Sequence, residues 1–125
     1  MIQINMKKIT IKKSQYNGWL EYNLHTQNGD IVSKCILNPK TGDCAEVETI
    51  EQYRNQGYMT LLLKYLTNKG LKYVQVNKNN KIAIHLYEKI GFVIEKEYVL
   101  EKEQMYSMIY VGNGLCSSRD CYNNC

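Results

Sequence analysis

The chain has 125 residues, enough for one domain with one hydrophobic core and too few for two. Its 44% hydrophobic and 22% charged content are those of an ordinary soluble globular protein. The net charge of +4 is scattered and no run of lysines exceeds two, so the composition disfavours nucleic-acid binding.

The sequence shows no signal for a membrane or for secretion. No apolar run approaches the roughly 18 residues that a membrane helix needs. Residues 1–5 lack the long apolar stretch of a secretion signal. We therefore expect a cytoplasmic protein without a membrane partner. The cysteines do not contradict this, because Cys35 and Cys44 lie in strand-like segments and are expected to be small buried hydrophobic side chains.

The first half of the chain is predicted to be an antiparallel meander. Hydrophobic and polar residues alternate there, a two-residue period typical of half-buried strands. Residues 27–30 supply a tight hairpin turn, and residues 38–43, with the only proline, supply a second turn. The predicted strands are residues 8–13, 19–26, 31–37 and 45–50.

After Gly57 the hydrophobic period becomes that of a helix. Met59, Leu62, Leu63 and Leu66 fall at i, i+3, i+4 and i+7, which is one helix face. Residues 68–70 end this helix with a lysine and a glycine. Residues 71–76 are then predicted to form a strand.

A second amphipathic helix follows. Asn79 or Asn80 caps its start and Gly91 stops it. Strands at residues 92–100 and 104–111 close the pattern, in the order ββββαβαββ. The fold class is α+β: a central mixed sheet of about seven strands with a locally parallel pair and two main helices, and no helix between the first two strands. The predicted inner face of the second helix is Ile82, Ala83, Leu86, Tyr87 and Ile90.

The end of the chain breaks every pattern. Residues 112–125 are rich in Cys, Asn and Ser, and we expect a disordered tail after a single domain at residues 1–111. Cys116, Cys121 and Cys125 have a spacing that matches no common zinc unit, and no histidine lies nearby. A metal or redox role for this tail is the alternative, and we predict no metal site.

The junction between strand 45–50 and the following helix suggests an anion site. A single glycine opens the helix, with basic and amide side chains just before it. This arrangement turns several backbone N–H groups toward one point at the positive end of the helix dipole, which suits a pyrophosphate. The alternative is that Gly57 serves only as a turn residue.

Two motifs resemble those of the GNAT superfamily of N-acetyltransferases. The family's cofactor motif, Q/R-x-x-G-x-G/A, is matched in its first four positions by residues 54–59. The family's second motif is N-x-x-A-x-x-x-Y-x-x-x-G-F. This second motif is matched by Asn80, Ala83, Tyr87, Gly91 and Phe92. The resemblance covers roughly residues 45–110, and it extends to the first forty residues only through their strand pattern.

The resemblance implies acetyl-CoA as co-substrate. In GNAT enzymes acetyl-CoA lies where two parallel strands splay apart, here residues 45–50 and 71–76. Its pantetheine arm pairs with a strand edge through main-chain bonds, as in β-augmentation, and its pyrophosphate meets the N–H groups of residues 55–60. The implied cofactor-binding residues are Val47, Glu48, Thr49, Arg54, Asn55, Gln56, Gly57, Tyr58, Met59, Thr60, Asn80, Ala83 and Tyr87.

The resemblance also implies catalytic roles. The acceptor amine has to lose a proton, because only about one lysine-like amine in a thousand is neutral at pH 7. In this family the base is often a glutamate on the fourth strand, which makes Glu46 and Glu48 candidates; the alternative is a solvated strand face. Tyr87 matches the tyrosine that protonates the leaving CoA thiolate. Its alternative role is that of a core residue.

Three departures from the family pattern affect the function, of which the mildest is Thr49 in place of the usual valine. Met59 replaces a small residue that lets the helix approach the cofactor. The missing helices between the first two strands leave an open cleft, which favours a protein side chain or terminus, or another bulky amine, as acceptor. A catalytically silent acyl-CoA-binding or interaction module is the alternative; an acetyltransferase of aminoacylated RNA is disfavoured by the scattered charge. Edge strands near the C-terminus are able to pair two copies as a homodimer.

Overall fold

The computed structural model describes residues 9–112 of the chain. The predictions for the start of the chain and for Cys116, Cys121 and Cys125 lie outside these described residues. The chain divides into two units, Met1–Leu71 and Lys72–Cys125, which we call the first and second unit. Each is described by itself below.

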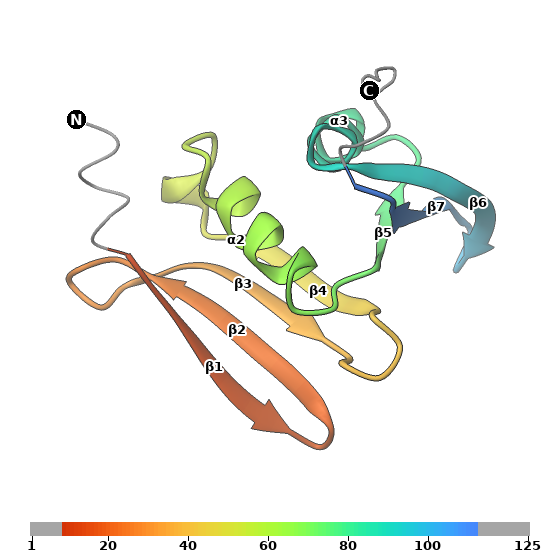
Figure 1. Ribbon diagram of the computed structural model, residues 1–125. Coiled ribbons are helices and arrows are strands. Elements are labelled where there is room, and N and C mark those ends of the chain that lie inside the picture. Colours follow the sequence, from red (N-terminus) through yellow and green to blue (C-terminus); the bar gives the residue numbers. More distant parts are fainter. Residues whose placement is uncertain (1–8, 113–125) are drawn as a thin grey trace. The chain divides into compact units, whose positions relative to one another are not determined.

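The first unit contains an antiparallel sheet with the strand order β1-β2-β3-β4 (Figure 1). Asn17 and Gly18 join β1 to β2, and both have positive φ, 51° and 86°. Such a two-residue turn suits the twist of a hairpin. The turn pairs Tyr16 with Trp19, so β1 extends beyond the predicted end at residue 13. No helix lies between β1 and β2, as predicted. The strands are β1 (Thr10–Tyr16), β2 (Trp19–His25), β3 (Ile31–Leu37) and β4 (Cys44–Thr49).

One face of this sheet is covered by helix α2 (Tyr58–Thr67) (Figure 1). The helix follows a short 3-10 turn, η1 (Glu51–Tyr53), and lies against β3 and β4. Its buried residues are Leu62, Leu63 and Leu66, three of the four predicted from the helical period. Tyr22 of β2 meets Tyr65 of α2 edge to face, with ring centroids 6.2 Å apart. The core of the first unit therefore lies between α2 and this sheet face.

The second unit contains a three-stranded antiparallel sheet in the order β5-β7-β6. Helix α3 (Lys81–Ile90) lies against β6. Val74 and Val76 are buried on one side of β5, as predicted from their alternation. Phe92 packs back on the last turn of α3, as predicted, with its ring centroid 5.9 Å from that of Tyr87. The strands are β5 (Tyr73–Asn77), β6 (Phe92–Leu100) and β7 (Glu103–Tyr110).

The predicted inner face of α3 is wrong at one position. Ile82 is 82% exposed, whereas Ile84, which was not predicted to face inward, is buried. Five residues separate Ile82 from Tyr87, about 140° of rotation around a helix. Because Tyr87 and Ile90 are buried on the packed side, Ile82 is directed away from it.

The seven strands and two helices give the predicted α+β fold, but the strand pairing differs from the predicted single mixed sheet. Within residues 9–112 every strand ladder is antiparallel, and β4 and β5 belong to different sheets. β5 pairs with β7, and neither of the two sheets that the described residues form contains a parallel pair. Both β4 and β5 are end strands of their own sheets.

The helices α2 and α3 have 10 residues each. Among the residues that the structure describes, no helix has the length and apolar character needed to span a bilayer.

Candidate functional site

The junction between β4 and α2 is built on backbone conformations that favour glycine and asparagine. Gly57, immediately before α2, has φ 85° and ψ 2°, and Asn55 has φ 65°. Residues with a Cβ rarely adopt this left-handed region, although asparagine tolerates it. The Gln56 side chain braces the loop by donating to the carbonyl of Gln52 over 3.1 Å. The chain therefore turns sharply into the helix at these positions.

The backbone N–H groups at this junction have no partners among the described residues. No side chain caps α2. The first N–H group of this helix with a main-chain acceptor is that of Leu61, which donates to the carbonyl of Gly57 over 3.1 Å. The N–H groups of residues 55–60 donate to no acceptor within residues 9–112. Free N–H groups at a helix start carry partial positive charge and form an anion-binding arrangement.

The free edge of β4 presents main-chain groups from Val47 and Thr49. The N–H of Ile50 donates to the carbonyl of Val32 on β3 over 2.8 Å. Because no peptide bond is cis, the carbonyl of Thr49 in the same peptide points away from β3. Directions alternate along an antiparallel strand, so Thr49 and Val47 direct N–H and C=O outward, whereas the main chain of Glu48 faces β3.

Arg54 contacts this edge. Its Nε donates to the carbonyl oxygen of Thr49 over 3.0 Å, and the side chain is exposed. The guanidinium therefore lies at the strand edge, and Arg54 immediately precedes residues 55–60 in the chain. Sequence reasoning placed Arg54 near the pyrophosphate and did not predict its contact with β4.

The two candidate bases differ in their surroundings. Val47 pairs with Cys35 on the face that α2 covers, so Glu46 and Glu48 project from the opposite face. Lys34 of β3 forms an ion pair with Glu46, with Nζ and Oε2 3.4 Å apart. Lys34 lies across from Glu48 in the ladder, but Glu48 forms no ion pair within residues 9–112. Sequence reasoning missed Lys34, because its position depends on the register between β3 and β4.

Two thiols lie behind this strand. Cys35 and Cys44 are 0% and 7% exposed, which confirms their prediction as buried residues, and their sulfur atoms are 3.1 Å apart. The hydrogen bond with Cys44, together with burial, raises the pKa of the Cys35 thiol well above its ordinary value. Cys35 therefore stays protonated and belongs to the core of the first unit.

In the second unit, the start of α3 is capped as predicted. The side-chain oxygen of Asn80 accepts a hydrogen bond from the N–H of Ala83 over 3.1 Å. The N–H of Asn80 itself donates to the carbonyl of Asn77 over 2.9 Å. This is the usual N-cap arrangement. The cofactor contact expected for Asn80 and Ala83 remains a prediction.

Tyr87 lies on the packed side of α3. Its side chain is 7% exposed, and its ring meets that of Phe92. The structure thus groups the predicted site residues into two sets. Residues 46–49 and 54–60 lie in the first unit, and Asn80, Ala83 and Tyr87 lie in the second.

A family model described as an acetyltransferase (GNAT) domain matches residues 17–94. The chain therefore belongs to the GNAT family of N-acetyltransferases, as the two sequence motifs predicted. No curated protein sequence matches this chain.

Solved structures share the fold. A spermidine N-acetyltransferase from Vibrio cholerae in complex with CoA and spermine has a TM-score of 0.64 at 19% identity, covering 74% of this chain and 65% of that one. The ribosomal-protein-S18-alanine N-acetyltransferase from Escherichia coli has a TM-score of 0.64 at 24% identity, covering 77% and 70%. An IAA acetyltransferase from Bacillus cereus has a TM-score of 0.66 at 16% identity, covering 82% and 98%. The chain thus spans just under two thirds of the Vibrio cholerae protein.

Proposed function

We propose that this protein transfers the acetyl group of acetyl-CoA to a primary amine by direct attack in a ternary complex. The observation that carries the proposal is the set of N–H groups at residues 55–60, which find no acceptor within residues 9–112. They belong to the segment that matches the family's cofactor motif. The diphosphate of acetyl-CoA would accept hydrogen bonds from them at the positive end of α2.

The edge of β4 would hold the pantetheine arm. This arm contains two amide groups, which are able to pair with a strand as a further strand would. Val47 and Thr49 supply outward N–H and C=O groups for this pairing. The side chain of Met59 at the start of α2 would limit how closely the helix approaches the cofactor.

Glu48 is the base that we favour. Glu46 is committed to the ion pair with Lys34, whereas Glu48 forms none within the described part of the chain and is exposed on the same face. A carboxylate there would accept the proton of the attacking ammonium group, directly or through water. Tyr87 would then supply a proton to the CoA thiolate, because a phenol with a pKa near 10 remains protonated at neutral pH.

The acceptor that we propose is a protein side chain or terminus, or another bulky amine. The short hairpin between β1 and β2 leaves no helix from residues 9–71 over the face that carries Glu46 and Glu48. The named acceptors of similar proteins, spermidine and an alanine of ribosomal protein S18, are primary amines. A cytoplasmic location is part of this proposal.

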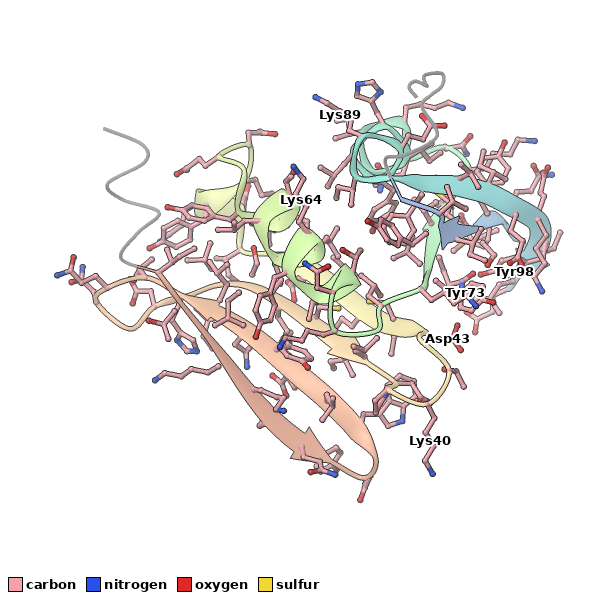
Figure 2. All side chains as sticks on the ribbon, viewed as in Figure 1. Lys40, Asp43, Lys64, Tyr73, Lys89 and Tyr98 are labelled. Atoms are coloured by element: carbon pink, nitrogen blue, oxygen red, sulfur yellow. The ribbon has the colours of Figure 1, made fainter. Side chains whose placement is uncertain are left out.

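The first experiment measures acetyl-CoA binding by calorimetry and thiol release over a panel of peptides and polyamines. We expect Tyr87→Phe to lower kcat about a hundredfold with little change in cofactor affinity. Tyr98→Phe is the matched control (Figure 2). The Tyr98 hydroxyl donates to the side-chain oxygen of Gln75 on β5 over 2.7 Å and has no proposed role in the reaction. Absence of acetyl-CoA binding at millimolar concentration would contradict the proposal. Binding without turnover on any amine would instead indicate a silent acyl-CoA-binding module.

A second experiment compares the two glutamates. Glu48→Gln is expected to lower kcat about a hundredfold, because a general base contributes a factor of that order. Glu46→Gln removes an exposed ion pair and is expected to change kcat less than tenfold. The reverse ranking would assign the base to Glu46.

A further inference from the structure

The Arg54 side chain is hydrogen-bonded to a main-chain carbonyl of β4 with which an extended ligand on this strand edge would pair. Its Nε donates to the carbonyl oxygen of Thr49 over 3.0 Å. This carbonyl is one of four outward groups on the edge of β4, with the N–H of Thr49 and both groups of Val47. A chain of amides that pairs with this edge therefore finds one of its four partners occupied by a guanidinium.

Arg54 also immediately precedes the N–H groups of residues 55–60, the proposed diphosphate position. A guanidinium bonds a charged phosphate oxygen more strongly than a neutral carbonyl oxygen, and its fork geometry matches phosphate. The side chain is exposed. A diphosphate bound at these N–H groups thus attracts Arg54 away from Thr49.

We propose that Arg54 is a positioning residue that couples the two ends of the cofactor. In the free protein it covers the carbonyl of Thr49. When the diphosphate binds, Arg54 moves to it and opens the carbonyl for the pantetheine arm. The inference rests on the proposed function. It makes the protein discriminate against thioesters without a diphosphate, because such donors have to displace Arg54 with no compensating bond.

The test compares two acetyl donors, acetyl-CoA and S-acetyl-pantetheine. Both contain the thioester and the two amides, but the second lacks the diphosphate. Arg54→Ala should lower kcat/KM for acetyl-CoA about tenfold, through loss of a charged hydrogen bond. It should raise kcat/KM for S-acetyl-pantetheine about two- to tenfold, because the Thr49 carbonyl becomes free. Opposite signs for one substitution distinguish coupling from a simple charge effect.

Two further variants sharpen the test. Arg54→Lys keeps the charge but not the planar fork of the guanidinium. Its kcat/KM for acetyl-CoA should therefore exceed that of Arg54→Ala, and its kcat/KM for S-acetyl-pantetheine should still exceed that of the unmodified protein. Lys40→Ala removes the same charge at the turn between β3 and β4, where the Lys40 side chain points away from the strands (Figure 2). Lys40→Ala should leave kcat/KM unchanged for both acetyl donors.

A direct readout is the carbonyl ¹³C chemical shift of Thr49 in solution. Arg54→Ala should move this signal, and 3′-phosphoadenosine 5′-diphosphate, which has no pantetheine arm, should move it in the same direction in the unmodified protein. An unchanged Thr49 signal, or equal losses for both donors in Arg54→Ala, would overturn the coupling. If the unmodified protein binds no acetyl-CoA, the proposed function fails instead. Binding of acetyl-CoA without the donor switch refutes only the role of Arg54.

Discussion

The chain contains two strand-to-helix junctions that are built in opposite ways. Before α3, the side chain of Asn80 caps the helix, and the N–H groups of Asn79, Asn80 and Lys81 all find acceptors within three residues. Before α2, the N–H groups of residues 55–60 find none within residues 9–112, and Gly57 stands where a capping side chain would be. The first junction stabilises itself, and the second leaves its donors to an external acceptor.

This difference has a thermodynamic meaning. At an N-cap, a capping side chain contributes roughly a few tenths of a kcal/mol more to helix stability than glycine does. Gly57 provides none, and it also has more conformational freedom to lose on folding than any other residue. The junction before α2 is therefore less stable than it need be. Such a loss is expected where a ligand completes the hydrogen bonding.

Of the substitutions that compare the two junctions, the largest predicted effect comes from one at Gly57. Gly57→Ala forces a Cβ into the left-handed region and should cost about 1 kcal/mol of stability. Because the N–H groups then turn, acetyl-CoA should bind at least about tenfold more weakly. Calorimetric titration measures the affinity, and urea unfolding measures the stability.

Gly18→Ala is the matched control for Gly57→Ala. Gly18 has φ 86°, and an added Cβ there meets no atom within 4 Å. This variant should show the same loss of stability with unchanged acetyl-CoA affinity. Equal affinity losses in both variants would mean that backbone strain alone, and not the direction of the N–H groups, controls binding.

A smaller effect is predicted at the capped junction. Asn80→Ala removes the acceptor of the Ala83 N–H and should lower the free energy of unfolding by about 1 kcal/mol. Asn79→Ala should cost less, because Asn79 contributes its main-chain N–H and not its side chain to the turn. Urea unfolding of the two variants checks this. Similar losses in both would refute a specific cap at Asn80.

The smallest effect concerns the thiol behind β4. The hydrogen bond with Cys44 and burial raise the pKa of the Cys35 thiol. As pH rises, the folded protein therefore keeps the thiol proton of Cys35 at pH values where the unfolded chain has lost it. Stability should therefore fall as pH rises past the ordinary thiol value, by about 0.8 kcal/mol between pH 7.5 and 9. Cys35→Ala should abolish this part of the slope in unfolding measurements. A slope that survives the substitution would assign it to other groups.

Local patterns predicted most of the fold. The limits of β3 and β6 agree with the alternation and turn residues, and the start of α3 agrees with the cap at Asn80. Which strands pair was less predictable, because hydrogen bonding between β5 and β7 joins residues far apart in sequence. The exposure of Ile82 was also missed, since Ile82 is apolar although it lies about 140° around the helix from the buried Tyr87.

The candidate site divides in the same way. The motif at residues 54–59 located the junction before α2, because it depends on one glycine and its neighbours. The contacts of Arg54 with Thr49 and of Lys34 with Glu46 depend on side-chain direction and strand register, which the sequence does not specify.

The hairpin at Asn17 and Gly18 makes this protein a convenient recipient for grafted segments. Tyr16 and Trp19 are paired across it, so an inserted segment would leave and rejoin the sheet at adjacent points. Loop tips of this kind tolerate insertions well. Transplanting a helical segment from a longer acetyltransferase into this position would show whether acceptor choice can be transferred as a separate module.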